Sequence, residues 1–390
     1  MRVKRPRHRN VERESITKSD AARRENWQSA YAAAARAVAV PFITSRVALV
    51  AIILFSRMIF VSGPYPHAPG ILPVLTTWDG AWYLDIATHG YGFRPGMAGF
   101  FPLYPLLIRL VAFVSSPALA AVLLSNLFLA AAAVLLYRLV RIDYDTVTGN
   151  DALALLLFTP ASVYFSAAYT ESTFLLLSVG AVLAARRGFW VVAGLCGMAL
   201  SATRYVGLLI ILPLAVEYYL QTKPHARKLS DWFSPQLLFA LCIVPVGLVA
   251  FYIFCYFRFH DAFAYLHTTA DWGRKLVPPW TTLRNSQSFP AFHLRFYECM
   301  LVIVLALFAV GIWLRMRWSY IAWAAVLLVA YLCSGNLEGF ARYLAVVFPL
   351  FLAAALLAQR SRAIYDTLFV FSTAMMAFWT ILLANGYWVT

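Results

Sequence analysis

Long apolar runs separated by short polar segments dominate the chain from residue 38 onward. The runs are continuous and do not alternate, and the longer ones reach the roughly 20 residues that a transmembrane helix needs, so they predict spanning helices and not a barrel. The predicted spans are about 38–61, 118–139, 152–168, 172–185, two short spans within 189–220, 237–257, 299–314, 320–333, 344–358 and 364–383. The pattern predicts an all-α polytopic membrane protein with about 11 transmembrane helices.

Two longer segments, 62–117 and 258–298, interrupt this pattern. The first holds WDGAWYLDIATHGY and FFPLYP, an aromatic-rich composition from which we expect interfacial helices near 79–89 and 103–114. The second is rich in aromatic residues, prolines and basic residues. With the N-terminus in the cytoplasm, both segments are expected on the non-cytoplasmic face.

Composition supports the membrane assignment. The chain is 62% hydrophobic and only 13% charged, about half the usual charged fraction of a soluble domain. Its net charge of +15 sits mostly in a basic arm, 1–37, and in the predicted inner loops of the single transmembrane domain, 38–390. This distribution follows the positive-inside rule and favours a multi-pass protein of the cytoplasmic membrane over a nucleic-acid-binding one.

Two arginines fall inside the first predicted span. A charge in hydrocarbon is costly, so Arg46, near the middle, should face the helix bundle or a polar cavity. Arg57 is close enough to the end to extend its charged group to the outer interface.

Asp79 is the strongest candidate for chemistry, because it lies among Trp78, Trp82 and Tyr83 in the first outer segment. A carboxylate beside tryptophan at a half-dry interface suits a general base. The residues alone leave a helix N-cap as an equal alternative. We expect Asp85 to be structural, paired with Arg109 or a backbone amide.

Outer-side cations indicate an anionic ligand such as a lipid phosphate, and the ligand-binding candidates are Arg204, Arg274 and Arg342. Glu338 lies four residues before Arg342, so a simple helix pair is the alternative there. Glu171 either caps the following helix or lines an acceptor site. The histidines show no metal-ligand spacing, and the five cysteines lie in apolar runs without a CxxC motif.

Several blocks, in order, resemble the PIG-V family of membrane mannosyltransferases and, through it, the GT-C class of glycosyltransferases. The blocks are WDGAWYLDIATHGY with FFPLYPLLIR, TPASVYFSAAYTES, SATRYVGLLIILPL, FHDAFAYLHTTADWGR with PPW, and FARYLAVVFPLFL. The WDG block with FFPLYP is the most specific, although glycine at position 80 stands where related chains often have serine. The chain resembles a shorter, bacterial member of the family.

The resemblance implies a GT-C-like bundle and an inverting transfer of a hexose, usually mannose, from a polyprenyl-phosphate sugar to a lipid-linked acceptor on the non-cytoplasmic face. Asp79 would be the catalytic base, and Arg204, Arg274 and Arg342 would bind the donor phosphate. The expected substrate-binding residues are Trp78, Trp82, Tyr83, His89, Tyr104, Glu171, Trp272 and Glu338. No metal and no cofactor beyond the lipid co-substrate is expected; membrane lipids and an accessory membrane subunit are the expected partners.

A transporter or flippase of lipid or lipid-linked sugar is the alternative, because the outer cations and the midspan Arg46 would suit it. We favour the enzyme, since transporters usually place their ionisable site near mid-membrane, whereas the acidic groups here gather at one face. A non-catalytic assembly subunit is a weaker third interpretation.

Overall fold

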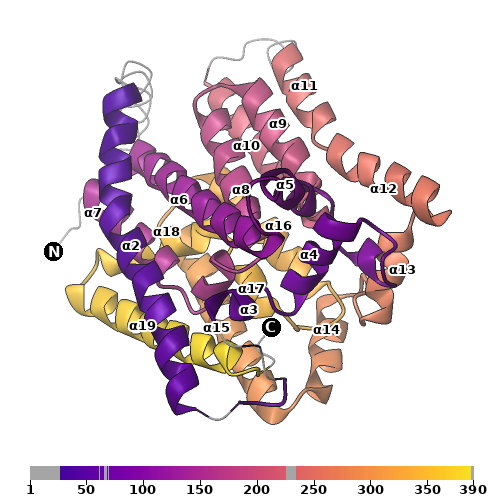
Figure 1. Ribbon diagram of the computed structural model, residues 1–390. Coiled ribbons are helices and arrows are strands. Elements are labelled where there is room, and N and C mark those ends of the chain that lie inside the picture. Colours follow the sequence, from indigo (N-terminus) through magenta and orange to yellow (C-terminus); the bar gives the residue numbers. More distant parts are fainter. Residues whose placement is uncertain (1–26, 61, 66–67, 69, 225–233, 388–390) are drawn as a thin grey trace.

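The computed structural model describes residues 27–60, 62–65, 68, 70–224 and 234–387, so most of the predicted basic arm lies outside the described residues. Within these ranges the chain forms helices joined by turns and contains no β-strand (Figure 1). The helices are α2 (Trp27–Ile59), α3 (Ile71–Leu75), α4 (Asp79–His89), α5 (Leu103–Val111), α6 (Pro117–Asp143), α7 (Thr146–Leu157), α8 (Glu171–Arg186), α9 (Trp190–Ser201), α10 (Ile211–Thr222), α11 (Pro235–Ile243), α12 (Val246–Phe259), α13 (Ala264–Asp271), α14 (Pro279–Asn285), α15 (Ala291–Trp313), α16 (Trp318–Leu332), α17 (Phe340–Leu344), α18 (Phe348–Ala358) and α19 (Arg362–Ala384), with 3₁₀ turns η1 (Met97–Gly99), η2 (Ser162–Phe165), η3 (Tyr205–Ile210) and η5 (Ser286–Ser288).

Six of the described helical segments are long and apolar enough to cross a membrane. They are Trp27–Ile59, Pro117–Asp143, Tyr205–Thr222, Pro235–Phe259, Ala291–Trp313 and Arg362–Ala384, and shorter apolar helices lie at Trp190–Ser201, Trp318–Leu332 and Phe348–Ala358. The prediction of an all-α polytopic membrane protein is confirmed. Figure 1 shows α2 and α19 crossing at one edge of the bundle and α11 with α12 forming the opposite edge.

The predicted span over 152–168 is wrong. Helix α7 already ends at Leu157, and the chain then turns into η2. The sequence Thr159-Pro160 explains the break, because proline disfavours a helical conformation in the residue before it and cannot donate a backbone hydrogen bond. The carbonyl groups left free at this break are bound by Arg46, whose Nη2 is 3.0 Å from the Leu157 carbonyl oxygen.

Arg46 therefore faces the bundle interior, as predicted. Its Nη1 donates to the carbonyl of Ser162 at 3.1 Å and to the hydroxyl of Ser166 at 2.8 Å. The other arginine of the same helix, Arg57, donates to the carbonyl of Ala384 at the end of α19, at 3.1 Å. Both side chains satisfy backbone groups that a helix end leaves free.

Other boundaries also differ from the prediction, two of them next to prolines. The first span begins at Trp27, so the last part of the predicted arm is helical. The predicted span 237–257 is divided into α11 and α12 next to Pro245, and the predicted span 344–358 begins as α17 before α18 starts at Phe348. The break predicted at Arg204 is confirmed, because Arg204 is extended between α9 and η3.

The start of α4 is docked on the turn that follows η2. The amide of Ala168 donates to the carbonyl of Leu75 at 2.7 Å, and the hydroxyl of Tyr169 donates to the carbonyl of Thr77 at 3.2 Å. A methyl group at Gly80 would lie 3.3 Å from the Cβ of Ala168. Glycine at position 80 lets the WDG segment approach this turn closely.

A polar network also joins several helices at their ends away from α4. Asp143, the last residue of α6, pairs with Arg186 at the end of α8 and accepts a hydrogen bond from Tyr320 at 2.8 Å. Glu217 on α10 is 1% exposed and accepts both guanidinium bonds of Arg317 at 2.7 Å. This network fastens α6, α8, α10 and α16 at the end away from α4.

Candidate active site

Asp79 is the first residue of α4, and its carboxylate is 28% exposed. The N-cap of the helix is Trp78, whose φ of 57° is rare for a residue with a side chain, so the N-cap alternative for Asp79 is wrong. Such strained backbone is retained where the surroundings fix it, commonly at functional sites. The Asp79 carboxylate meets Arg342 of α17, with Oδ2 2.5 Å from Nη1.

Arg342 continues into a buried chain of charges. Its Nε lies 3.2 Å from Oε1 of Glu171, the fully buried first residue of α8. The same Oε1 is 2.5 Å from Nη2 of Arg204, whose Nε donates to Thr170 at 2.8 Å. Glu171 thus neither acts as an N-cap nor faces open space; it holds two of the three predicted phosphate-binding arginines together.

Arg274, which follows α13, is the third predicted arginine and has a different environment. Its guanidinium donates to the hydroxyl of Ser334 at 3.3 Å, to the carbonyl of Asn336 at 3.2 Å and to the carbonyl of Glu338. All three acceptors are neutral. The Glu338–Arg342 pair considered from the sequence is replaced at Arg342 by the contacts to Asp79 and Glu171.

The three arginines meet at Tyr343, which the sequence interpretation did not select. The guanidinium carbon lies 5.5 Å from the ring centre for Arg204, 5.5 Å for Arg274 and 5.1 Å for Arg342. Burial alone would raise the pKa of Tyr343, but these arginines outweigh it and hold the pKa below its ordinary value. The signal was the FARYL block itself, where Tyr343 adjoins Arg342.

The charges in this cluster do not balance. Asp79 and Glu171 are the carboxylates that the three arginines contact in the described part of the chain, so one positive charge is in excess. An excess positive charge of this kind favours the binding of an anion next to the partly exposed Asp79 carboxylate.

Aromatic residues form one wall next to α4. Trp82 stacks on Phe100 at 5.4 Å, and both contact Trp272, at 6.3 and 5.7 Å. The guanidinium of Arg94 lies 3.7 Å above the Trp82 ring and also pairs with Asp85 at 2.7 Å. The predicted partner Arg109 is wrong, because Arg94 comes back over α4 to pair with Asp85. A structural role for Asp85 stays a prediction.

Three predicted substrate-binding residues are not brought to the charge cluster. Tyr104 is fully buried, and its hydroxyl lies 2.7 Å from that of Ser125. His89 is exposed at the far end of α4 and stacks on Phe93 at 4.0 Å. The third, Trp78, packs on Tyr65 with ring centres 5.0 Å apart. Tyr83 packs on Tyr104 at 5.3 Å but does reach the cluster, because its phenol meets Thr170 and the charges of Arg204, Asp79 and Glu171.

No group of three or more His, Cys, Asp or Glu side chains that could hold a metal is found among the described residues. The nearest approach to such chemistry in the second outer segment is the pair His267–Asp261, at 2.7 Å. The absence of a metal from the reaction stays a prediction.

Comparison with known proteins agrees with the sequence resemblance. The profile of the family described as Mannosyltransferase (PIG-V) matches residues 66–324, more than half of the chain, and ends before Arg342. GPI mannosyltransferase 2 of Drosophila pseudoobscura pseudoobscura is 34% identical over 142 residues, 32% of this chain and 31% of the relative. The protein of the same name from Drosophila melanogaster is 30% identical over 112 residues, 26% of this chain and 25% of the relative. The matched stretch thus spans less than a third of these relatives.

Solved structures of the Archaeoglobus fulgidus oligosaccharyltransferase are also similar. One, tethered to an acceptor peptide, gives a TM-score of 0.46 at 14% identity, covering 88% of this chain and 55% of that one. Another, with an inhibitory peptide and a dolichol-phosphate, gives 0.44 at 15% identity, covering 89% and 56%.

Proposed function

Because the chain belongs to the PIG-V mannosyltransferase family, we propose that it is an inverting membrane glycosyltransferase. It would move a mannose from polyprenyl-phosphate mannose to a hydroxyl of a lipid-linked acceptor on the non-cytoplasmic face. The observation that carries this proposal is the cluster in which the Asp79 carboxylate pairs with Arg342 while Arg204 and Arg274 share the ring of Tyr343. The proposed base and the proposed phosphate-binding arginines are therefore neighbours.

In the proposed reaction Asp79 is the base. The acceptor oxygen bonds to the anomeric carbon as the bond from that carbon to the phosphate oxygen breaks, and the electron pair leaves with the phosphate. The hydroxyl proton goes to Oδ1 of Asp79, the oxygen that does not bond Arg342. Arg342 fixes the direction of the carboxylate before the acceptor arrives.

The departing group is a polyprenyl phosphate, which gains negative charge as the sugar leaves. The excess positive charge of Arg204, Arg274 and Arg342 would stabilise that charge without a proton donor. Arginine suits this task because its planar, permanently charged fork can bind two phosphate oxygens at once.

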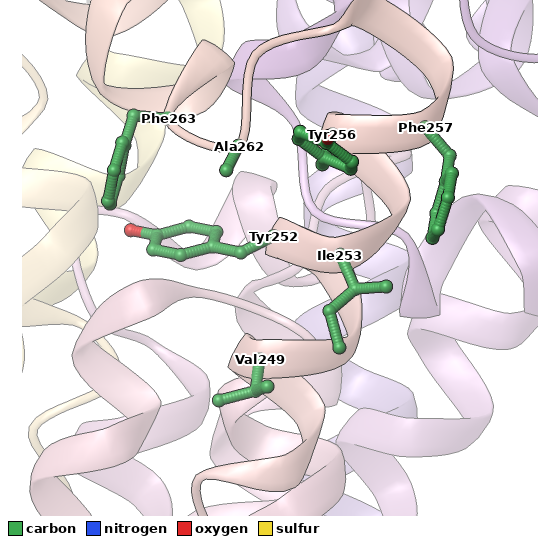
Figure 2. Close-up of a pocket in the computed structure, with 7 residues that line it drawn as sticks. All are labelled: Val249, Tyr252, Ile253, Tyr256, Phe257, Ala262 and Phe263. Carbon is green, nitrogen blue, oxygen red and sulfur yellow. The ribbon is translucent and has the colours of Figure 1, made fainter.

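An apolar groove offers a place for the lipid tail. It has a volume of about 520 Å³ and is lined by Val249, Tyr252, Ile253, Tyr256, Phe257, Ala262 and Phe263. Figure 2 shows one row of these side chains on α12, with Ala262 and Phe263 on the turn that follows the helix. An isoprenoid chain is the part of the proposed donor that matches such a lining.

Aromatic contacts lead from this groove toward the arginines. The rings of Tyr252 and Phe263 are 5.8 Å apart at the groove. Two residues beyond Phe263, Tyr265 on α13 lies 5.8 Å from Tyr205, and Tyr205 directly follows Arg204. A lipid tail in the groove and its phosphate at the arginine cluster would therefore belong to one amphiphilic molecule.

The test is transfer by the purified full-length protein in vesicles. Radiolabelled polyprenyl-phosphate mannose is offered with a panel of membrane glycolipids, and GDP-mannose serves as the alternative donor. We expect label to move from the polyprenyl donor only, with inverted anomeric configuration by NMR. Label that crosses the bilayer unchanged and never reaches an acceptor would contradict the enzyme and favour the transporter alternative.

A further inference from the structure

We infer that Tyr343 is the positioning residue of the phosphate site: its single phenol ring holds the guanidinium groups of Arg204, Arg274 and Arg342 in one arrangement that grips one phosphate. The identity of that phosphate as a polyprenyl phosphate rests on the proposed function. The arrangement itself rests on the contacts around Tyr343.

The three arginines come from three distant places in the chain. Arg204 precedes η3, Arg274 follows α13 and Arg342 lies on α17 beside Tyr343. Like charges repel, and burial removes the water that would screen them. The face of an aromatic ring carries negative potential and attracts each guanidinium, so one ring with contacts of 5.1 to 5.5 Å offsets part of that repulsion.

The ring is itself held firmly. Tyr331 of α16 stacks on it with centres 5.1 Å apart. Nη2 of Arg342 lies 3.3 Å from the Tyr343 hydroxyl. Gly339, with a φ of 74°, starts the short helix, and a Cβ there would lie only 3.2 Å from the ring. The ring therefore has little room to turn away from the arginines.

The arginines retain capacity for a ligand. The Arg204 side chain is only 14% exposed. Its Nη1 is buried and has no hydrogen-bond partner among the described residues. Arg274 donates to neutral oxygens, at the Ser334 hydroxyl and at the carbonyls of Asn336 and Glu338. A buried donor without an acceptor is costly, so an anion at this place would satisfy a group that the protein itself leaves unpaired.

The ionisation of the Tyr343 phenol also depends on the net charge of the arginine cluster. Burial raises the pKa of Tyr343, and Arg274, Arg342 and Arg204 together outweigh burial and lower it, while Asp79 acts in the opposite sense. Tyr265, which packs nearby on α13, shows the opposite result, because burial raises its pKa well above the ordinary value. Tyr343 should therefore ionise before its buried neighbours, and an anion bound to the arginines should delay that ionisation.

The first experiment separates the contribution of the Tyr343 ring to phosphate binding from that of its hydroxyl. Full-length protein in detergent is titrated with a polyprenyl monophosphate, and binding is measured for the wild type, Tyr343→Phe, Tyr343→Leu and the matched control Tyr137→Leu on α6. We expect Tyr343→Leu to weaken binding by about 10- to 100-fold, since about three cation–π contacts are lost. Tyr343→Phe and Tyr137→Leu should stay within about threefold of the wild type. Wild-type affinity in Tyr343→Leu, or equal losses in Phe and Leu, would overturn the inference.

The second experiment does not depend on Tyr343→Leu folding or on sugar transfer. Alkaline absorbance titration of the wild type minus Tyr343→Phe isolates the ionisation of Tyr343. We expect its midpoint to lie below that of free tyrosine and to move to higher pH when the polyprenyl monophosphate is added. An unmoved midpoint would contradict the inference. A moved midpoint without any mannose transfer would leave the inference standing and refute only the proposed sugar chemistry.

Discussion

One arginine connects the two halves of the proposed chemistry. Arg342 hydrogen-bonds Asp79 through Nη1 and forms an ion pair with Glu171, and its guanidinium also lies over Tyr343. A planar guanidinium can contact two carboxylates and an aromatic ring at the same time, whereas a lysine ammonium is a compact point charge on a flexible stem. The geometry around Asp79 therefore depends on the shape of this side chain as well as on its charge.

Replacing Arg342 by lysine tests that dependence. We expect Arg342→Lys to lower kcat/KM by about 10- to 100-fold, because a charged hydrogen bond worth roughly 1.5–3 kcal/mol is lost or misdirected. Steady-state transfer kinetics measure the effect. The matched control is Arg109→Lys on the exposed face of α5, which should change little. Equal behaviour of the two variants would show that Arg342 acts as a simple charge.

Local motifs identified the site residues whose role is set by their immediate neighbours. Asp79 and Arg342 were predicted from the WDG and FARYL blocks, and the structure brings them together. Tyr343 was missed because its role depends on three arginines that approach from distant segments. The predicted pairing of Asp85 failed for a similar reason, since a loop returns Arg94, and not Arg109, over α4.

At the scale of the elements, short helices and breaks place the charged groups. Helix α4 was predicted with its observed bounds, because its polar and aromatic composition sets it apart from the apolar runs. The break at Arg204 was also predicted, since 32 residues are too many for one span of ordinary tilt. The early end of α7 was not, because an apolar run hides a turn unless the proline in Thr159-Pro160 is given priority over hydropathy.

The turn that presents Arg204 makes a specific demand on Gly207. A Cβ at Gly207 would overlap the backbone of Leu200, whereas a Cβ at Gly180 of α8 would meet its nearest side-chain atoms at 3.6 Å, an ordinary contact. We expect Gly207→Ala to cost about 1–3 kcal/mol and to reduce transfer by displacing Arg204. Gly180→Ala should be neutral or slightly stabilising, as alanine favours a helix. Thermal melting with transfer assays checks both, and an unaffected Gly207→Ala would refute this account of the turn.

At the scale of the whole molecule, polar networks lie at both ends of α8. The network of Asp143, Arg186, Glu217 and Arg317 fastens one end, and the cluster around Tyr343 occupies the other. The division suggests separate duties, because only the second network gathers three arginines around one ring, whereas the arginines of the first are paired with carboxylates. The sequence predicted the helical bundle from hydropathy alone, whereas buried ion pairs between helices needed coordinates. The orientation deduced from the basic loops stays a prediction.

The separation of duties can be tested with Glu217→Ala. Removing this buried carboxylate leaves Arg317 without its carboxylate partner and takes from Arg186 one of its two, so we expect a loss of roughly 3–5 kcal/mol in stability. Transfer per folded molecule should stay near the wild-type value, as measured by activity normalised to the monodisperse fraction. A large loss of specific activity at unchanged stability would show that the two ends are coupled.

The most direct measurement of the central claim is transfer by Asp79→Asn compared with Asp85→Asn. Asparagine keeps the shape of the side chain and an oxygen for Arg342 but cannot accept the hydroxyl proton, and a general base typically contributes about 10²- to 10⁴-fold. We predict a loss of that size in kcat for Asp79→Asn, with melting temperature and binding of the polyprenyl monophosphate retained, and a change of no more than about threefold for Asp85→Asn. Near-normal transfer by a folded Asp79→Asn protein would contradict the assignment of Asp79 as the base.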